Sequence, residues 1–354
     1  MSDLSNNFKI IEPYTPGEQP LYADKVKLNT NENPYPPSPA VAEALRTLRY
    51  EDFNLYPDPT SSELTGAIAK YCDIDENMVF AGVGSDDVLA ASFMAFFNSG
   101  KKILFPDITY AFYDVWANLF GIPYEQPPLD ENFKIVKEDY YADNGGIVFP
   151  NPNAPTGILT PVSEIEDILK HNTASIVIVD EAYIDFGGES ALKLINKYEN
   201  LAVTRTFSKS RSLAGMRIGF AVANPKLIAE LNKVKYSYNS YTLNIPSIKL
   251  GTAALADEEY FRTAIDKIIS TRERTKTRLA KLGFTFTDSK SNFIFATHKF
   301  LKAEDIFNAL KREHIFVRYF NKPRIDNYLR ITIGTDEEMD KLIDFLSSYI
   351  EVQK

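Results

Sequence analysis

The stretch LAVTRTFSKSRSLAGMRIGFAVA, residues 201–223, decides the fold. Its apolar ends, LAVTRTF and RIGFAVA, are typical of buried strands, and a loop rich in serine and glycine joins them. Lys209 lies in this loop, directly after the first strand. Burying an ammonium group costs several kcal/mol unless the group is paired or neutral. Lys209 is therefore either a solvated loop residue or an amine that the fold holds in a pocket.

The segments before this stretch alternate apolar runs with amphipathic ones. The apolar runs KILF, GIVF and ASIVIV also indicate strands. Segments with helical spacing lie between them, at residues 61–72, 85–97, 111–120 and 162–171. Continuous apolar strands that alternate with helices are typical of an α/β fold whose mostly parallel sheet is covered by helices on both faces.

The two ends of the chain follow other patterns. The first part is rich in Pro, Asn and Tyr and predicts an extended arm. After about residue 240, a long charged helix precedes short strands and further helices, which indicates a smaller α+β domain. We therefore expect an N-terminal arm over residues 1–37, a large domain over 38–240 and a small domain over 241–354.

Composition excludes several classes of protein. The 354 residues carry 39 basic and 48 acidic side chains, a net charge of −9, so nucleic acid is not an expected partner. The single cysteine, Cys72, excludes an internal disulfide framework, and three separated histidines argue against a metal site. No apolar run is long enough for a signal peptide or a membrane span, so the expected location is the cytoplasm and no membrane partner is expected.

Polar groups follow the apolar runs at several points. Asp180 follows ASIVIV, Ser208 and Lys209 follow LAVTRTF, and the turn NPNAPTG, residues 151–157, follows GIVF. The segment GVGSDD, residues 82–87, leads into a helix start of the kind that binds anions. Each group alone is also typical of a cap, a turn or a solvated loop. Because ligands bind at the carboxyl ends of parallel strands, their joint occurrence predicts one binding crevice.

The order NPNAPTG, VDEAY and TFSKSRSLAGMRIGF resembles that of the pyridoxal-phosphate (PLP) dependent aminotransferases of fold type I, class II. Within this family the chain is most similar to the histidinol-phosphate aminotransferase group, through YTPG, KLNTNENPYPPSP, LYPDP, GVGSDD and YLRITIG as well. The resemblance covers nearly the whole chain. It implies a large PLP-binding domain with a sheet of seven strands, the small domain and a homodimer.

The resemblance also implies roles around the cofactor. Lys209 forms a Schiff base with PLP and then acts as general base and acid on the substrate. Asp180 keeps the ring nitrogen protonated, and Tyr183 bonds the phenolic oxygen. These three are the expected catalytic residues. The cofactor-binding set is completed by Ser85, Asp86, Tyr110, Asn153, Ser208, Arg217 and Tyr56.

Three of these positions need comment. Asp86 is expected to contribute its backbone N–H to the phosphate, with its side chain turned away or capping the helix. Tyr56 is expected to reach into the neighbouring subunit, so that the homodimer shares its active sites. The family usually has an asparagine directly before Pro-Thr-Gly, where this chain has Ala154. Either Asn153 supplies that amide or Tyr183 suffices, and both alternatives stay open.

The expected substrate residues bind anions. Arg330 matches the family's substrate arginine, whose planar fork suits a carboxylate or a phosphate. The remaining members of the implied substrate site are Tyr14, Glu32, Asn33 and Arg318. The implied reaction is ping-pong transamination between glutamate and imidazole-acetol phosphate. The alternatives are an aromatic amino-acid aminotransferase, a PLP-dependent decarboxylase of a phosphorylated amino acid, and a non-catalytic binding module.

Overall fold

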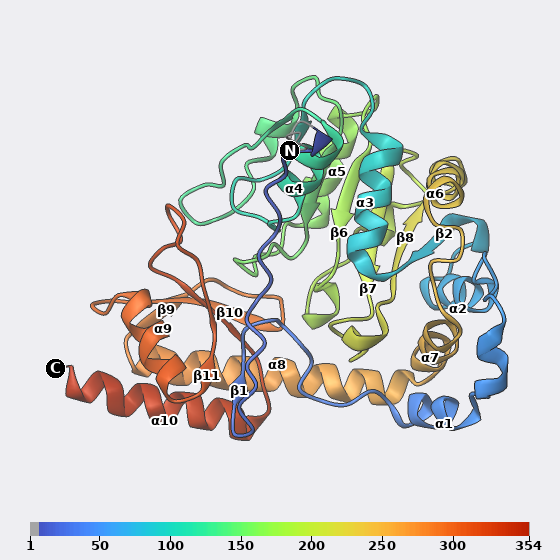
Figure 1. Ribbon diagram of the computed structural model, residues 1–354. Coiled ribbons are helices and arrows are strands. Elements are labelled where there is room, and N and C mark those ends of the chain that lie inside the picture. The colour runs from blue at the N-terminus through green and yellow to red at the C-terminus, as the bar shows by residue number, and fades with distance from the viewer. Residues whose placement is uncertain (1–6, 354) are drawn as a thin grey trace, which may run out of the picture.

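The computed structural model describes residues 7–353 and contains one large and one small sheet (Figure 1). The large sheet has seven strands, and all are parallel except β8. The expected mostly parallel sheet is thereby confirmed. In spatial order its strands are β2 (Val79–Gly82), β8 (Gly219–Ala223), β7 (Leu201–Thr206), β6 (Val177–Asp180), β5 (Ile147–Pro150), β3 (Ile103–Leu104) and β4 (Tyr124–Glu125).

Helices cover both faces of the large sheet, because alternate strand residues point to opposite sides. Val177 and Val179 of β6 belong to one core cluster, and Ile178 belongs to the other. The first face carries α1 (Pro39–Thr47), α2 (Ser62–Cys72), α5 (Val162–His171) and α7 (Ile245–Ala256). The second face carries α3 (Gly84–Phe96), α4 (Tyr113–Phe120) and α6 (Pro225–Tyr238).

The small sheet is antiparallel and packs with helices of the C-terminal part. Its strands are, in order, β12 (Arg318–Tyr319), β13 (Leu329–Thr332), β10 (Phe293–His298) and β9 (Phe284–Phe286). The helices are α8 (Glu258–Lys281), α9 (Ala303–Arg312) and α10 (Asp336–Val352). Thr335 and Glu338 form a capping box at the start of α10, which fixes where that helix begins.

Short 3₁₀ helices complete the connections between these elements. They are η2 (Tyr50–Asn54), η3 (Glu76–Met78), η4 (Lys137–Tyr140), η5 (Ile184–Phe186), η6 (Ala191–Leu194) and η7 (Ala214–Met216). No helix in residues 7–353 is long and apolar enough to cross a membrane.

The N-terminal arm runs as an extended chain beside both sheets (Figure 1). It forms β1 (Val26–Lys27), which pairs in parallel with β11 (Ile315–Phe316) of the small domain. Further along, the Tyr260 hydroxyl of α8 donates to Pro36 O at 2.7 Å. The arm is thus attached to the C-terminal part of the chain on both sides of the segment TNENP.

The two hydrophobic cores meet between α7 and α8. Ile248 and Ala254 of α7 pack in the cluster under the large sheet, whereas Phe261 of α8 belongs to the cluster of the small one. The long helix α8 then runs from the large domain to the small one (Figure 1). The division of the chain after residues 37 and 240 stays a prediction, and the packing of α7 favours a second boundary nearer residue 257.

Candidate active site

Lys209 lies in the loop between β7 and β8, at the carboxyl end of β7. Its Nζ donates to the backbone oxygen of Thr30 in the arm at 3.0 Å, and no carboxylate in residues 7–353 forms an ion pair with it. Burial, helped by the positive charge of Arg330, lowers the pKa of the Lys209 ammonium to about 8. A large fraction of the amine is therefore neutral near pH 8. Lys209 is a pocket amine and not a solvated loop residue.

Asp180 ends β6 and is 3% exposed. Its side chain faces α4 because it alternates with Val179, and the Tyr113 hydroxyl donates to Oδ2 at 3.1 Å. The Thr204 hydroxyl and the backbone N–H of Ala182 each lie 3.3 Å from Oδ1. No cationic side chain of the described chain pairs with it, and burial raises the pKa of Asp180 to about 7. This carboxylate fits a cationic ligand.

Replacing Asp180 with asparagine is expected to stabilise the cofactor-free protein at pH 8 by on the order of a few kcal/mol. The folded-state pKa, about 7, lies above the roughly 3.9 of an unfolded Asp. Between these two pKa values the folded wild-type chain keeps a proton on Asp180 that the unfolded chain has lost, and this proton stabilises the wild type. The stabilisation is lost as the pH rises towards 7. Urea unfolding should show the advantage of the variant shrinking between pH 8 and pH 5. A constant advantage across this range would contradict the assignment.

The start of α3 and Arg217 form an anion site. Gly82 ends β2 and Gly84 is the first residue of α3, and the unpaired N–H groups of a helix start attract negative charge. Arg217 Nη1 donates to Ser208 Oγ at 3.3 Å, and Nη2 donates to Asp86 Oδ2 at 3.3 Å. Guanidinium, hydroxyl and helix start thus lie together. Ser85 is the second residue of α3.

The Asp86 side chain differs from expectation. It neither turns away nor caps the helix, because it accepts hydrogen bonds from Arg217 and from the Tyr110 hydroxyl, the latter at 2.7 Å. The neighbouring Asp87 makes the cap, since its Oδ2 accepts from the backbone N–H of Val83 at 2.9 Å. The Asp86 carboxylate therefore joins the arginine of the anion site to Tyr110.

The Gly84→Ala variant is expected to bind PLP at least about tenfold more weakly. Gly84 has φ +81°, and an added Cβ would lie 2.5 Å from Arg217 Nη2, so the arginine would have to move. Titration of the single tryptophan's fluorescence measures the dissociation constant. Gly100→Ala is the matched control, because Gly100 has φ +75° and nothing within 4 Å of its Cβ position. Equal weakening in both variants would rule out a specific effect on the anion site.

Two tyrosines expected at the cofactor ring lie beside Lys209 and Asp180. The Tyr183 ring centroid is 5.9 Å from Lys209 Nζ, and its hydroxyl accepts from Asn31 Nδ2 at 2.9 Å. The Tyr110 ring packs edge to face with Tyr113 at 5.7 Å, on the side of Asp180. The structure thus brings both tyrosines to the same crevice as the lysine and the carboxylate.

Asn153 is buried with its amide already engaged. Its Nδ2 donates to Ile108 O and to Thr156 Oγ1, each at 3.0 Å. Its Oδ1 is buried and has no hydrogen-bond partner among the described residues. Because both amide protons already bond to acceptors of the protein, Asn153 has none left for a ligand.

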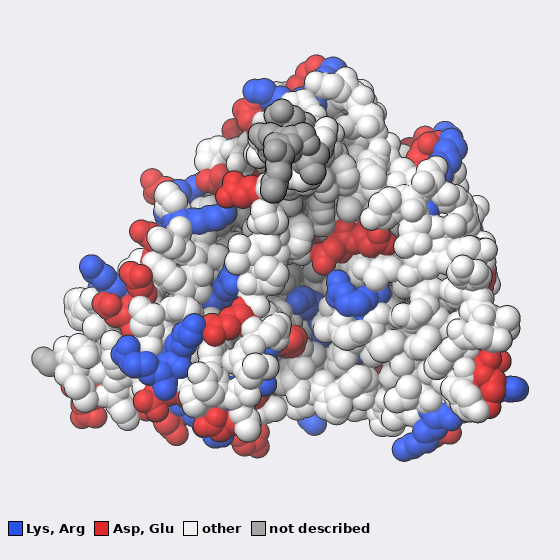
Figure 2. Space-filling view, in the orientation of Figure 1, with Lys and Arg blue, Asp and Glu red and all other residues white. Residues whose placement is uncertain are grey.

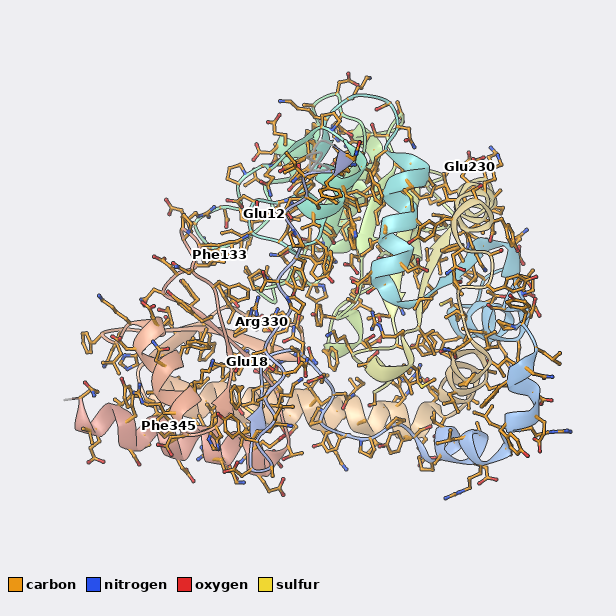
Figure 3. The ribbon with its side chains drawn as sticks, viewed as in Figure 1. Glu12, Glu18, Phe133, Glu230, Arg330 and Phe345 are labelled. Atoms are coloured by element: carbon orange, nitrogen blue, oxygen red, sulfur yellow. The ribbon has the colours of Figure 1, made fainter. Side chains whose placement is uncertain are left out.

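Arg318 and Arg330 lie opposite each other in register on β12 and β13. Arg330 Nη2 donates to Asn29 O at 3.1 Å, while its buried Nε has no partner. Neither arginine forms an ion pair with a carboxylate in residues 7–353, and burial lowers the pKa of Arg330. Figure 3 places Arg330 near the meeting point of the two sheets, beside the arm, and Figure 2 shows basic side chains sunk in this face. The pair fits an anionic ligand.

The other expected substrate residues lie in the arm. The Tyr14 ring stacks on Phe112 at 4.2 Å. Glu32 accepts from Thr30 Oγ1 at 2.7 Å and forms an ion pair with Lys27. The Tyr14 contact joins the arm to the large domain, whereas both Glu32 contacts lie within the arm.

Asn33 contacts the lysine loop, whereas Tyr56 lies on the surface of the chain. Asn33 Nδ2 donates to Lys209 O at 3.1 Å and to Ser210 O at 3.3 Å, so it fixes the backbone of the lysine loop. Tyr56 is 81% exposed and stacks on Tyr241 at 4.6 Å, so its side chain does not enter the site of its own chain.

Sequence reasoning missed four groups that complete the site. Thr30 supplies the acceptor for Lys209, Asn31 contacts Tyr183, and Tyr113 and Thr204 hold Asp180. Thr204 lies on β7 directly opposite Asp180 and on the same face of the sheet, so the alternation of β7 could have revealed it. Asn31 lies inside the motif TNENP, but nothing local shows that its amide faces a residue 152 positions away.

Comparisons with known proteins show the family of the chain. The sequence model of the family "Aminotransferase class I and II" matches residues 23–346. The chain is 52% identical over 351 residues to a histidinol-phosphate aminotransferase of Brachyspira hyodysenteriae, with 99% of each chain covered. It is 53% identical over 336 residues to one of Clostridium beijerinckii, covering 95% of this chain and 94% of the relative.

Solved structures share the fold. The histidinol-phosphate aminotransferase from Clostridium acetobutylicum superposes with a TM-score of 0.85 at 24% identity, covering 92% of this chain and 99% of that one. The enzyme from Sinorhizobium meliloti, solved in complex with pyridoxal-5′-phosphate, gives a TM-score of 0.83 at 23% identity, covering 92% and 91%.

Proposed function

This chain belongs to the class I and II aminotransferases, and from that premise we propose that it transfers an amino group from glutamate to imidazole-acetol phosphate. The products are 2-oxoglutarate and histidinol phosphate, and the step belongs to histidine biosynthesis. Relatives named histidinol-phosphate aminotransferase, which share about half of their residues with this chain, favour this reaction over the aromatic and decarboxylase alternatives. The geometric observation that carries the proposal is that the Lys209 amine and the Asp180 carboxylate, neither of them ion-paired in the described chain, follow the ends of neighbouring parallel strands.

The pocket fits pyridoxal phosphate as cofactor. When bound, PLP supplies an aldehyde that accepts amino groups and a protonated ring that withdraws electrons. Asp180 lacks a cationic partner and suits the ring nitrogen, whereas Lys209 lacks an acidic partner and suits the aldehyde carbon. Arg217, Ser208 and the N–H groups of the α3 start suit the phosphate. Tyr110 and Tyr183 would contact the ring. The Tyr110 hydroxyl is bonded to Asp86, and the Tyr183 hydroxyl is bonded to Asn31.

Lys209 also moves the substrate proton. A base must be neutral to accept a proton, and burial places the pKa of Lys209 at about 8, near working pH. Its Nζ would accept the proton from the substrate Cα and keep it from solvent, so that it can be delivered on the cofactor side and not back to Cα. The hydrogen bonds from Asn33 to the backbone of Lys209 and Ser210 keep the lysine loop in place while this proton moves.

The arginine pair binds the anionic end of each substrate. Glutamate offers a carboxylate, and imidazole-acetol phosphate offers a phosphate, and both match a guanidinium fork. Arg330 and Arg318 carry no competing protein carboxylate, so one site can serve both half-reactions. Tyr14 and Glu32, both in the N-terminal arm, would line this end of the pocket.

The working enzyme is a cytoplasmic homodimer with shared sites. Tyr56, with its neighbours Tyr50, Phe53 and Leu55, exposes a large apolar surface that isolated monomers rarely leave open. A partner subunit would cover it, and Tyr56 would then reach the partner's phosphate site. Mixing inactive Lys209→Ala and Tyr56→Ala chains should restore part of the activity in mixed dimers, whereas no restoration would contradict shared sites.

The acceptor preference tests the reaction. With glutamate as donor, the purified protein loaded with PLP should prefer imidazole-acetol phosphate strongly over phenylpyruvate. Equal or better turnover of phenylpyruvate would move the protein to the aromatic aminotransferases. Release of carbon dioxide without need of a keto acid would indicate a decarboxylase, and an absorbance spectrum unchanged by glutamate would indicate a binding module.

A further inference from the structure

The hydroxyl of Tyr183 has a donor but no acceptor. It accepts a hydrogen bond from Asn31 Nδ2 at 2.9 Å, and no acceptor for its own proton lies within hydrogen-bond distance in residues 7–353. The side chain is 9% exposed and its ring packs edge to face on Phe293 at 5.2 Å, so the ring has little freedom. The Tyr183 proton is therefore free for an acceptor that binds beside it, and Lys209 Nζ lies 5.9 Å from the ring centroid.

Asn31 is held on all sides, although it belongs to the extended arm. It is 1% exposed, and its backbone has φ 55°, a left-handed conformation that asparagine tolerates better than most residues. Its backbone N–H donates to Thr332 Oγ1 at 3.0 Å, and the Thr332 hydroxyl donates back to Asn31 Oδ1 at 3.0 Å. Asn292 Nδ2 donates to Asn31 O at 2.9 Å. These bonds turn the Asn31 amide so that its N–H faces Tyr183.

The asparagine expected at the cofactor cannot take this part. Both amide protons of Asn153 go to Ile108 O and Thr156 Oγ1, and Ala154 follows it in the chain. An amide donor is therefore missing where the turn NPNAPTG meets the pocket. The arm supplies one from the opposite direction.

We propose that Asn31 is a positioning residue for the reaction, which acts through Tyr183 by directing the tyrosine proton onto the phenolic oxygen of the cofactor. This inference rests on the proposed function, because it presumes that PLP binds at Lys209. A hydroxyl that already accepts from Asn31 is polarised and donates more strongly to a second acceptor. The chain thus replaces a direct amide contact with a relay from Asn31 through Tyr183.

The pH midpoint of the visible absorption band tests the relay. This midpoint reports the proton shared by the Lys209 nitrogen and the phenolic oxygen, and a donor to the charged oxygen lowers it. Asn31→Gly removes the amide without adding charge and accepts the positive φ. We expect its midpoint to rise by about one pH unit. In a Tyr183→Phe background, which keeps the ring packing, Asn31→Gly should add no further shift.

Two single variants distinguish the relay from other causes. Asn29→Ala removes another buried arm amide, which donates to Glu18 O at 2.8 Å, and should leave the midpoint unchanged. Asn153→Ala should also leave it unchanged. An unshifted Asn31→Gly midpoint, an equal shift in Asn29→Ala, or a shift in Asn153→Ala that exceeds that of Asn31→Gly would each overturn the relay. If the wild-type protein with PLP shows no visible band, the proposed function itself fails and the relay with it.

Discussion

Replacing Lys209 with alanine is expected to lower kcat by at least about 10³-fold and to abolish the visible absorption band of the PLP-loaded protein. Under the proposed function, the variant removes both the amine that would hold the cofactor and the base that would move the Cα proton. Burial keeps that amine partly neutral, and within residues 7–353 no other lysine lies over the Tyr183 ring or donates to the backbone oxygen of Thr30. Turnover with glutamate and the spectrum of the same sample measure the two effects separately.

Lys235 provides a matched control within the chain. It is also buried, and burial lowers its pKa, but it lies on α6 and donates to Pro59 O at 2.6 Å. The Lys235→Ala variant should keep the visible band. If that variant loses the band while Lys209→Ala retains it, Lys209 is not the cofactor lysine.

Arg330→Met should lower kcat/KM by about 10²- to 10³-fold for both glutamate and imidazole-acetol phosphate, because a buried substrate anion would lose its charged partner. Met keeps much of the side-chain volume that packs over Phe293 and Phe320, so a collapse of the pocket is not expected. Arg330→Lys should be intermediate, since a lysine keeps the charge but loses the planar fork. Steady-state kinetics with each substrate varied in turn measure the effect.

Arg274→Met serves as the control for removing an arginine. Arg274 pairs with Asp336 and Asp340 on α10 and contacts nothing in the pocket, so its loss should leave both kcat/KM values unchanged. A loss confined to one substrate in Arg330→Met would contradict a single anion site that serves both half-reactions.

The main elements of the site follow from the sequence because they depend on local patterns. Apolar runs in the sequence predicted the strands β5, β6 and β7. Residues that directly follow parallel strands lie at one edge of the sheet. Asp180, Lys209 and the turn at Asn153 therefore follow the ends of three neighbouring parallel strands, at one edge of the sheet. The helices α1, α6 and α7 were not predicted, although each begins with a proline at its first or second position, which is a signal for a helix start.

The contacts that complete the site depend on distant residues. The bond between Asn31 and Tyr183 joins positions 152 apart, and the bond between Lys209 and Thr30 joins positions 179 apart. Whether the Asn153 amide can donate to a ligand depends on its hydrogen bond to Ile108 O, and the motif does not reveal this bond. The side chain of Asp86 was misplaced for a similar reason, because Tyr110 and Arg217 approach it from other elements.

Chemical trapping of the cofactor tests the central assignment most directly. The PLP-loaded protein is reduced with borohydride, digested, and its peptides are mapped by mass spectrometry for a pyridoxyl group. The label should lie on Lys209 alone and should disappear in Lys209→Ala. A label on Lys235 or another lysine, or no label on a protein that binds PLP, would contradict the assignment of Lys209 as the cofactor lysine.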